Sequence, residues 1–150
     1  MVTENNDDNR SNRKMASIEM RLQVMASQIE KLLNSEILRF DNRCRRTFPV
    51  AHGIYRIFDL EKFNETIRAG RTKTAAEGLQ QRLYRNHLMG DQEGNLRTQL
   101  VNDGLCPNIE VAKRFIRDQL AVQVLVVDDR DERTWLEHFM LGVLRPKYSD

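Results

Sequence analysis

The spacing of apolar residues divides the chain into one long amphipathic segment and several shorter ones. Between residues 16 and 40, apolar side chains recur in alternating steps of four and three, without an interrupting Gly or Pro, at Ile18, Leu22, Met25, Ile29 and Leu32. This spacing predicts one long helix with an apolar stripe. Glu36 occupies the next position of the stripe, while Leu33, Ile37 and Phe40 extend a second stripe.

Two interpretations of this helix stay open. In one, its stripe packs along the chain's own domain. In the other, the helix associates with a second copy, forming a homodimer, or with a partner, because the spacing is that of a coiled coil for about two heptads. Pro49 should end the helical segment. We therefore divide the chain into an unstructured polar tail (1–15), an amphipathic helix (16–47) and a domain (48–150).

After Pro49 the pattern changes to that of strands. Residues 54–60 and 65–72 predict two neighbouring strands, and the turn residues at 62–64 favour an antiparallel hairpin. Residues 121–127 are nearly all apolar, which is typical of a central strand buried on both faces. The fold class expected from these elements is α+β, within the broader α/β group.

Helical patterns connect and follow these strands. We expect a helix over residues 74–89 with Ala76, Leu79 and Leu83 inward, a short helix ending near residue 101, and a third helix over 108–120 capped by Asn108. A last helix should begin at Asp131 and end before Pro146. Its buried stripe is expected to consist of Leu136, Phe139, Met140, Val143 and Leu144.

Composition narrows the class of protein. The chain is 40% hydrophobic and 31% charged, as in soluble globular proteins, and no apolar run approaches the roughly 18 to 20 residues of a membrane span. The polar N-terminus lacks the apolar core of a signal peptide, so we expect a cytoplasmic protein without a membrane partner. Cys44 and Cys106 lie far apart, with no Cys or His beside them at ligand spacing, and are predicted to be reduced thiols.

Charge is unevenly distributed along the chain. Between residues 68 and 85 one acid, Glu77, stands among five basic residues, which are Arg68, Arg71, Lys73, Arg82 and Arg85. Between residues 128 and 137 the balance reverses, with five acids against two arginines. An anion is expected to bind the basic stretch, and a polyanion that contacts both stretches needs a cation between them.

Two side chains in these segments could take part in chemistry. Tyr55, in the first strand, would act as a base only if cations nearby favour its phenolate; the alternative is a strand tyrosine with its hydroxyl at the surface. Glu137 lies at the edge of the last helix's buried stripe and needs a partner there. That partner is either a hard cation such as Mg²⁺ or Arg133, one turn earlier.

The order of short motifs along residues 50–150 resembles that of the GIY-YIG nuclease superfamily. The motifs are Gly53-Ile54-Tyr55, then Gly70-Arg71-Thr72, then Arg82 and His87, then Glu137 and the ending Leu144-Arg145-Pro146-Lys147-Tyr148. The first motif is intact, and the ending is similar to that of restriction-endonuclease members. Several motifs in this order are more specific than any one of them.

The resemblance implies a small three-stranded antiparallel sheet flanked by helices, with the N-terminal helix as an extension. It also implies a metal-dependent endonuclease that hydrolyses phosphodiester bonds, with nucleic acid, mostly DNA, as its partner. Tyr55 would be the general base, and Glu137 would hold Mg²⁺ or Mn²⁺. Arg82 would hold the scissile phosphate and His87 would orient the tyrosine. Further expected nucleic-acid contacts are Arg68, Arg71, Lys73 and Arg85.

The chain departs from the family pattern at three places. Arg68-Ala69-Gly70 stands where the family has Tyr-Ile-Gly, and Ser149 replaces an asparagine. Arg82 and His87 are five residues apart, about 140° round an α-helix, so Arg85 or Asn86 is an alternative for one of their roles. Two alternative functions follow from these departures and from the long helix. One is a catalytically weak or inactive nucleic-acid-binding module, and the other is an assembly protein built on the N-terminal helix.

Overall fold

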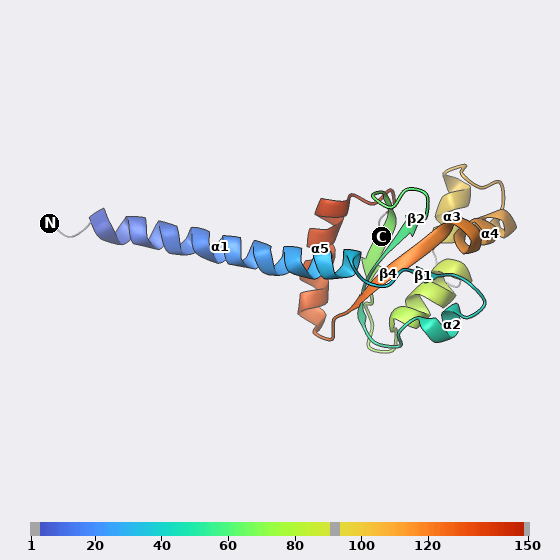
Figure 1. Cartoon of the computed structure of the whole chain (residues 1–150), viewed down its shortest axis with the longest axis horizontal. Helices are drawn as coiled ribbons and strands as arrows, with labels where there is room; N and C mark the ends of the chain where they lie inside the picture. The colour runs from blue at the N-terminus through green and yellow to red at the C-terminus, as the bar shows by residue number, and fades with distance from the viewer. Residues whose placement is uncertain (1–3, 91–93, 149–150) are drawn as a thin grey trace.

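An antiparallel sheet of four strands, in the order β1-β4-β2-β3, organises the chain in this computed structural model (Figure 1). The structure describes residues 4–90 and 94–148, with side chains from residue 17 onward. The strands are β1 (Leu38–Arg39), β2 (Gly53–Asp59), β3 (Thr66–Arg71) and β4 (Leu120–Val126). The predicted antiparallel hairpin, β2–β3, and the predicted internal strand, β4, are both confirmed.

The expected three-stranded sheet was too small by one strand. Residues 38–39, which the apolar pattern assigns to the long helix, instead pair with β4 at the sheet's edge. Their burial alternates with the period of a strand, because Leu38 and Phe40 are buried and Arg39 is exposed. Glu36 interrupts the apolar stripe, so the apolar spacing of a helix ends before residue 38.

The long helix, α1 (Glu4–Leu33), begins inside the segment expected to be an unstructured tail and ends before residue 38. Its apolar stripe has two unlike halves. Ile29 and Leu32 are buried against the domain, whereas Ile18 and Leu22 are 57% and 49% exposed. Figure 1 shows the helix projecting away from the sheet. The expectation that the stripe packs on its own domain is therefore correct only for the C-terminal half.

Helices cover both faces of the sheet. One face packs against η1 (Gln81–Leu88), α3 (Leu96–Asn102) and α4 (Ile109–Gln119), with α2 (Cys44–Thr47) beside them. The other packs against α5 (Arg130–Leu144) and the end of α1. Successive side chains of β2 point to opposite faces, so Tyr55 belongs to the η1 face and Ile54 to the α5 face. None of the helices in the described segments is both long and apolar enough to cross a membrane.

Two helix caps test the sequence-based boundaries. Asn108 caps α4 as predicted, with its side chain accepting a hydrogen bond from the backbone N–H of Val111. The last helix is capped by Asp129 rather than by Asp131, through a bond from the N–H of Glu132. Of the predicted stripe of α5, Leu136 and Met140 are buried, while Val143 is exposed.

The segment expected to form an α-helix over residues 74–89 differs most from its prediction. Residues 74–76 form a turn in which Ala76 is exposed. The following η1 is a π-helix, with backbone hydrogen bonds five residues back such as that from Met89 N–H to Tyr84 O. The start of this segment packs against the backbone of residues 49–51. Leu79 N–H bonds to Ala51 O, and a Cβ added to Gly78 would lie 1.7 Å from the Val50 oxygen.

Candidate functional site

Tyr55 lies inside the domain, on the face of β2 that packs against η1. It is fully buried, so the alternative of a surface hydroxyl is wrong. In the sheet register Tyr55 lies directly opposite Gly70, which places the tyrosine of the first motif beside the glycine of the second. Gly53 allows β2 to approach β4, because an added Cβ would lie 2.1 Å from the Leu125 oxygen.

Two side chains of η1 converge on the Tyr55 hydroxyl. The His87 Nε2 atom lies 2.8 Å from it, and Arg82 Nε donates to it over 3.4 Å. The two residues are five apart, and the i→i+5 bonding of a π-helix makes residues at that separation neighbours on successive turns. The angle of about 140° expected for an α-helix therefore does not apply. Of the two alternatives, Asn86 bonds elsewhere and Arg85 is exposed.

The hydrogen bonds of His87 fix where its proton lies. The backbone N–H of Leu96 donates to Nδ1, so a neutral His87 carries its proton on Nε2 and donates to the Tyr55 oxygen. Complete burial lowers the pKa of His87 well below its usual 6.5, and the positive charges of Arg68 and Arg82 lower it further. At neutral pH the tyrosine oxygen therefore accepts from both a neutral imidazole and a guanidinium.

Glu77 and Asn86 complete the surroundings of Arg82, and sequence reasoning had assigned no role to Glu77. Its Oε1 atom lies 3.6 Å from Arg82 Nη1 and accepts a bond from Asn86 Nδ2 over 3.2 Å. All three side chains are buried or nearly so. The signal in the sequence was that Glu77 is the single acid in the basic stretch. An acid in that position orients the guanidinium and balances its charge.

Arg68, which the resemblance to the GIY-YIG superfamily aligns with that family's second tyrosine, lies in the interior. Its residue is 3% exposed, and Nη1 donates to the backbone oxygen of Gly94 and to Gln99 Oε1. It belongs to the Tyr55 side of the sheet, since its charge acts on His87. Lys73 and Arg85 are the exposed members of the predicted nucleic-acid contacts.

Glu137 and Arg71 form a second polar cluster, on the α5 face. Arg71 Nε lies 3.3 Å from Glu137 Oε1, so the partner of Glu137 is Arg71. Arg133, the alternative partner, donates instead to the backbone oxygens of Val127 and Asp128. Among the described residues, the buried Glu137 Oε2 has no hydrogen-bond partner. A buried carboxylate oxygen without a partner is costly and is suited to an additional ligand.

Among the described residues, that oxygen is a candidate ligand for a divalent metal. Among the side chains that the structure describes, no group of three or more His, Cys, Asp or Glu could together hold a metal ion. Mg²⁺, however, is often held by a single carboxylate with water and phosphate as its remaining ligands. The two polar clusters lie on opposite faces of the sheet and share β3: Gly70 is opposite Tyr55, and the next residue, Arg71, is opposite Ile54.

The C-terminal ending has a structural role in this fold. The backbone N–H groups of Lys147 and Tyr148 bond to Thr66 and Ile67, which extends pairing along the outer edge of β3. The Tyr148 hydroxyl donates to Asp103, and the Lys147 amine lies 3.4 Å from the same carboxylate. The ending therefore closes the edge of β3 near Arg68.

The chain was compared with protein-family models, with curated proteins and with solved structures. No match was found in any of the three comparisons. Function is therefore inferred from the site's geometry and from the order of its motifs.

Proposed function

We propose that this chain is a metal-dependent endonuclease of the GIY-YIG type that hydrolyses phosphodiester bonds in DNA. One observation carries the proposal: His87 and Arg82 both direct N–H groups at the hydroxyl of Tyr55, which lies opposite Gly70. These residues occur in the order in which the family's motifs occur. The four-stranded α+β architecture supplies the antiparallel hairpin on which such a site is built.

In this proposal Tyr55 is the general base. Two N–H donors directed at one oxygen stabilise a negative charge on that oxygen, which favours the phenolate. The phenolate accepts a proton from a water molecule, and the resulting hydroxide attacks the phosphorus atom. The bond between phosphorus and the leaving oxygen then breaks. His87, held neutral by its burial, is a positioning residue that fixes the tyrosine oxygen.

Glu137 would hold the divalent metal, Mg²⁺ or Mn²⁺, through its carboxylate. When bound, such an ion supplies positive charge that stabilises the charge developing on the phosphate and the leaving group. Arg71, already beside this carboxylate, would take part in neutralising the same phosphate. The exposed Lys73 and Arg85 would contact neighbouring phosphates, which adds affinity but no sequence preference.

The site is closed in this structure, because Tyr55 is fully buried and Arg82 is 7% exposed. We propose that DNA opens it by drawing Arg82 from Glu77 to the scissile phosphate. Both interactions are charge-assisted, so a phosphate replaces a carboxylate of similar chemistry. Arg82 would then stabilise the reacting phosphate, while Glu77 keeps its bond from Asn86.

The second candidate is a nucleic-acid-binding module of the same fold that does not cleave. It is favoured by the complete burial of Tyr55 and by Arg68 at the second motif's tyrosine position. Such a module would bind DNA in a salt-sensitive manner through its exposed basic side chains. For either function we propose a cytoplasmic location, which accords with the two buried free cysteines.

The deciding experiment incubates the purified chain with supercoiled plasmid, single-stranded DNA and structured RNA, in Mg²⁺ or Mn²⁺ and in EDTA. We expect metal-dependent nicking of the plasmid by the wild-type chain. Glu137→Ala should lower the rate by at least about a hundredfold. The matched control is Glu132→Ala on the same helix, which should leave the rate unchanged. Salt-sensitive binding of DNA without cleavage in any metal would favour the module.

A further inference from the structure

The short helix α2 and its N-cap carry three exposed arginines, Arg43, Arg45 and Arg46, which we call the α2 arginines. Among the residues that the structure describes, their guanidinium groups take part in no hydrogen bond or ion pair. Asp41, the nearest acid along the chain, accepts instead from the backbone N–H of Arg43. Residues 39–48 hold four arginines and this one acid, whereas the whole chain has a net charge of only +2. Such a concentration of positive charge is suited to an anionic partner.

The fourth arginine of this segment, Arg39, has the kind of contact that the α2 arginines lack. Its Nη2 atom donates to the backbone oxygens of Arg117 and Asp118, over 3.3 Å and 3.0 Å, in the last turn of α4. A cation at this position pairs with carbonyl groups that the end of a helix leaves without partners. Arg39 therefore stabilises the fold, and within the described residues the α2 arginines have no comparable contact.

The α2 arginines lie beside the start of η1, the helix that carries two residues of the proposed site. Residues 49–51 follow α2, and their backbone oxygens accept hydrogen bonds from the two residues before η1. The Gln80 side chain also donates to the backbone oxygen of Arg45. A rise of at most about 1.5 Å per residue places the exposed Arg85 within about 8 Å of Gln80 along the helix axis. Each strand of DNA has a phosphate about every 3.4 Å, so one duplex can contact both groups.

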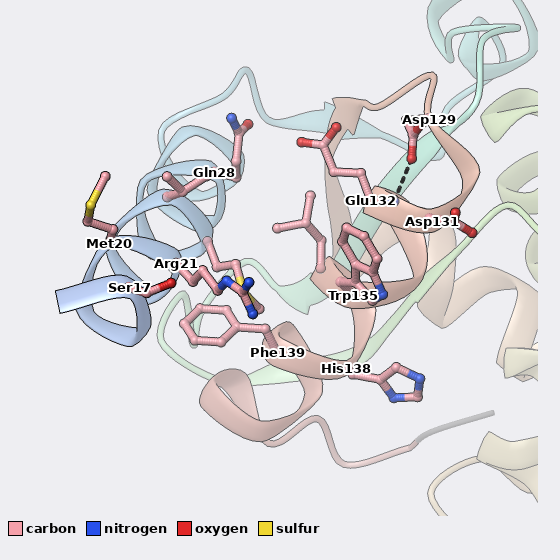
Figure 2. Close-up of a pocket in the computed structure, with 13 residues that line it drawn as sticks. Ser17, Met20, Arg21, Gln28, Asp129, Asp131, Glu132, Trp135, His138 and Phe139 are labelled. Carbon is pink, nitrogen blue, oxygen red and sulfur yellow. Dashed lines mark hydrogen bonds between the residues drawn. The ribbon is translucent and has the colours of Figure 1, made fainter. Parts of the chain in front are cut away.

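The opposite face of the sheet has the reverse charge. Figure 1 shows α2 on the side of the sheet away from α5. Figure 2 shows Asp129, Asp131 and Glu132 gathered at the start of α5, beside the groove between α5 and α1. Negative charges repel a polyanion, so this side disfavours DNA whereas the α2 side attracts it. The charge distribution therefore directs DNA to the face of the sheet that contains Tyr55.

We propose that the α2 arginines bind the phosphates of duplex DNA and lengthen the basic surface of η1. The proposal rests on the proposed function for the identity of the partner, but it requires only that DNA binds, not that it is cleaved. A planar guanidinium suits this role because it can donate two parallel hydrogen bonds to one phosphate. The exposed side chains of residues 41–47 are all polar, so none would enter a bilayer, which favours nucleic acid over an anionic membrane.

Binding of a short fluorescent DNA duplex to the full chain tests this proposal, by anisotropy in EDTA at several salt concentrations. EDTA prevents metal-dependent cleavage, so only binding is measured. In about 0.1 M salt, Arg43→Ala/Arg45→Ala/Arg46→Ala should bind at least about tenfold more weakly than wild type. The slope of log K against log salt should decrease in magnitude by about 2 to 3, since each phosphate contact contributes about 0.9. Lysine at the same three positions should restore the slope, because it keeps the charge.

The matched control removes three exposed positive charges from α1 and α5, as Arg21→Ala/Lys31→Ala/Arg130→Ala. This variant should bind DNA within about twofold of wild type, because salt screens charges that are far from the bound duplex. Urea unfolding should be the same for wild type and the alanine variant of α2, since the replaced side chains are exposed.

The outcomes separate this proposal from the proposed function. If the alanine variant of α2 binds as tightly as wild type, the proposal is wrong even if the chain cleaves DNA. If that variant alone loses affinity, the proposal stands even if the chain cleaves no substrate. A wild-type chain that binds vesicles containing phosphatidylserine, or neither ligand, instead of DNA would also overturn it.

Discussion

Tyr55 and Arg56 are consecutive residues of one strand, both essentially inaccessible to solvent, yet their surroundings differ in kind. Arg56 donates from Nε to Gln123 and from Nη1 to Phe63 O and Thr66, and its guanidinium lies against the rings of Phe58 and Phe63. Burial lowers the pKa of Arg56 to about 10, so it is still charged at neutral pH. Tyr55 instead receives two donors on one oxygen.

We interpret the residues around Arg56 as a structural cluster and the residues around Tyr55 as a candidate functional cluster. Arg56 holds the β2–β3 loop through its bond to Phe63 O. It also bonds to Gln123, which donates to Leu33 O and Ser35 O and so links Arg56 to the end of α1. Around Tyr55, by contrast, two arginines act on a histidine that burial already keeps neutral. Like charges gathered in the interior oppose folding, and such arrangements are common at sites of chemistry.

The largest change in stability is expected at Arg56. Arg56→Met keeps much of the apolar stem but removes every hydrogen bond, leaving Gln123 Oε1 and Phe63 O without that donor. We expect the free energy of unfolding to fall by about 2 to 4 kcal/mol. Urea denaturation measures this loss. Cleavage per folded molecule should remain that of the wild type, and a specific loss of activity would contradict the division between the two clusters.

A smaller, pH-dependent effect is expected at His87. Its pKa lies below 6.5 in the folded chain, so the unfolded chain binds the proton more readily and acidification favours unfolding. Between pH 6.5 and the folded pKa, wild-type stability should fall by up to about 1.4 kcal/mol per pH unit through this group. His87→Gln should lack this contribution, so the difference between the two unfolding curves should change with pH. A difference that is constant from pH 7.5 to 5 would show that His87 is not held neutral.

The smallest effect is expected from removing the exposed Arg85 from the π-helix. The deletion leaves Arg82 and His87 four positions apart, which is one turn of an α-helix, so both can still reach Tyr55. Cleavage should remain within about tenfold of that of Arg85→Ala, the matched control for the lost charge. Inserting an alanine after Tyr84 makes the separation six and should abolish activity. Equal activity of the deletion and the insertion would refute the role assigned to the π-helix.

The parts of the fold that the sequence predicts are those with strong local signals. The β2–β3 hairpin, the apolar β4 strand and the Asn108 cap depend on residues close to one another along the chain. Strand β1 was missed because two residues are too few to show a period of two. The cap of α5 was misplaced because Asp129 and Asp131 are both suitable caps, and only the path of the chain decides between them.

The candidate site shows a different limit. Family order selects Tyr55, Arg82 and His87, and the structure brings these three together. The five-residue spacing of Arg82 and His87 does not suit an α-helix, and the sequence pattern did not predict the π-helix that brings them together. The pairing of Arg71 with Glu137 joins residues far apart in the chain and depends on how α5 packs against β3, which apolar periodicity does not determine.

The most direct test measures the rate of Mg²⁺-dependent plasmid nicking and the free energy of unfolding on the same preparations of wild type, Tyr55→Phe and Arg56→Met. Tyr55→Phe removes the oxygen that accepts from His87 and Arg82, so the free energy of unfolding should fall by about 1 to 3 kcal/mol, and the rate per folded molecule should fall by about 10²- to 10⁴-fold. Arg56→Met should also reduce stability, but it should leave the rate per folded molecule undiminished. If Tyr55→Phe cleaves as fast as wild type, the tyrosine is not the base and the site is not a nuclease centre of the proposed kind.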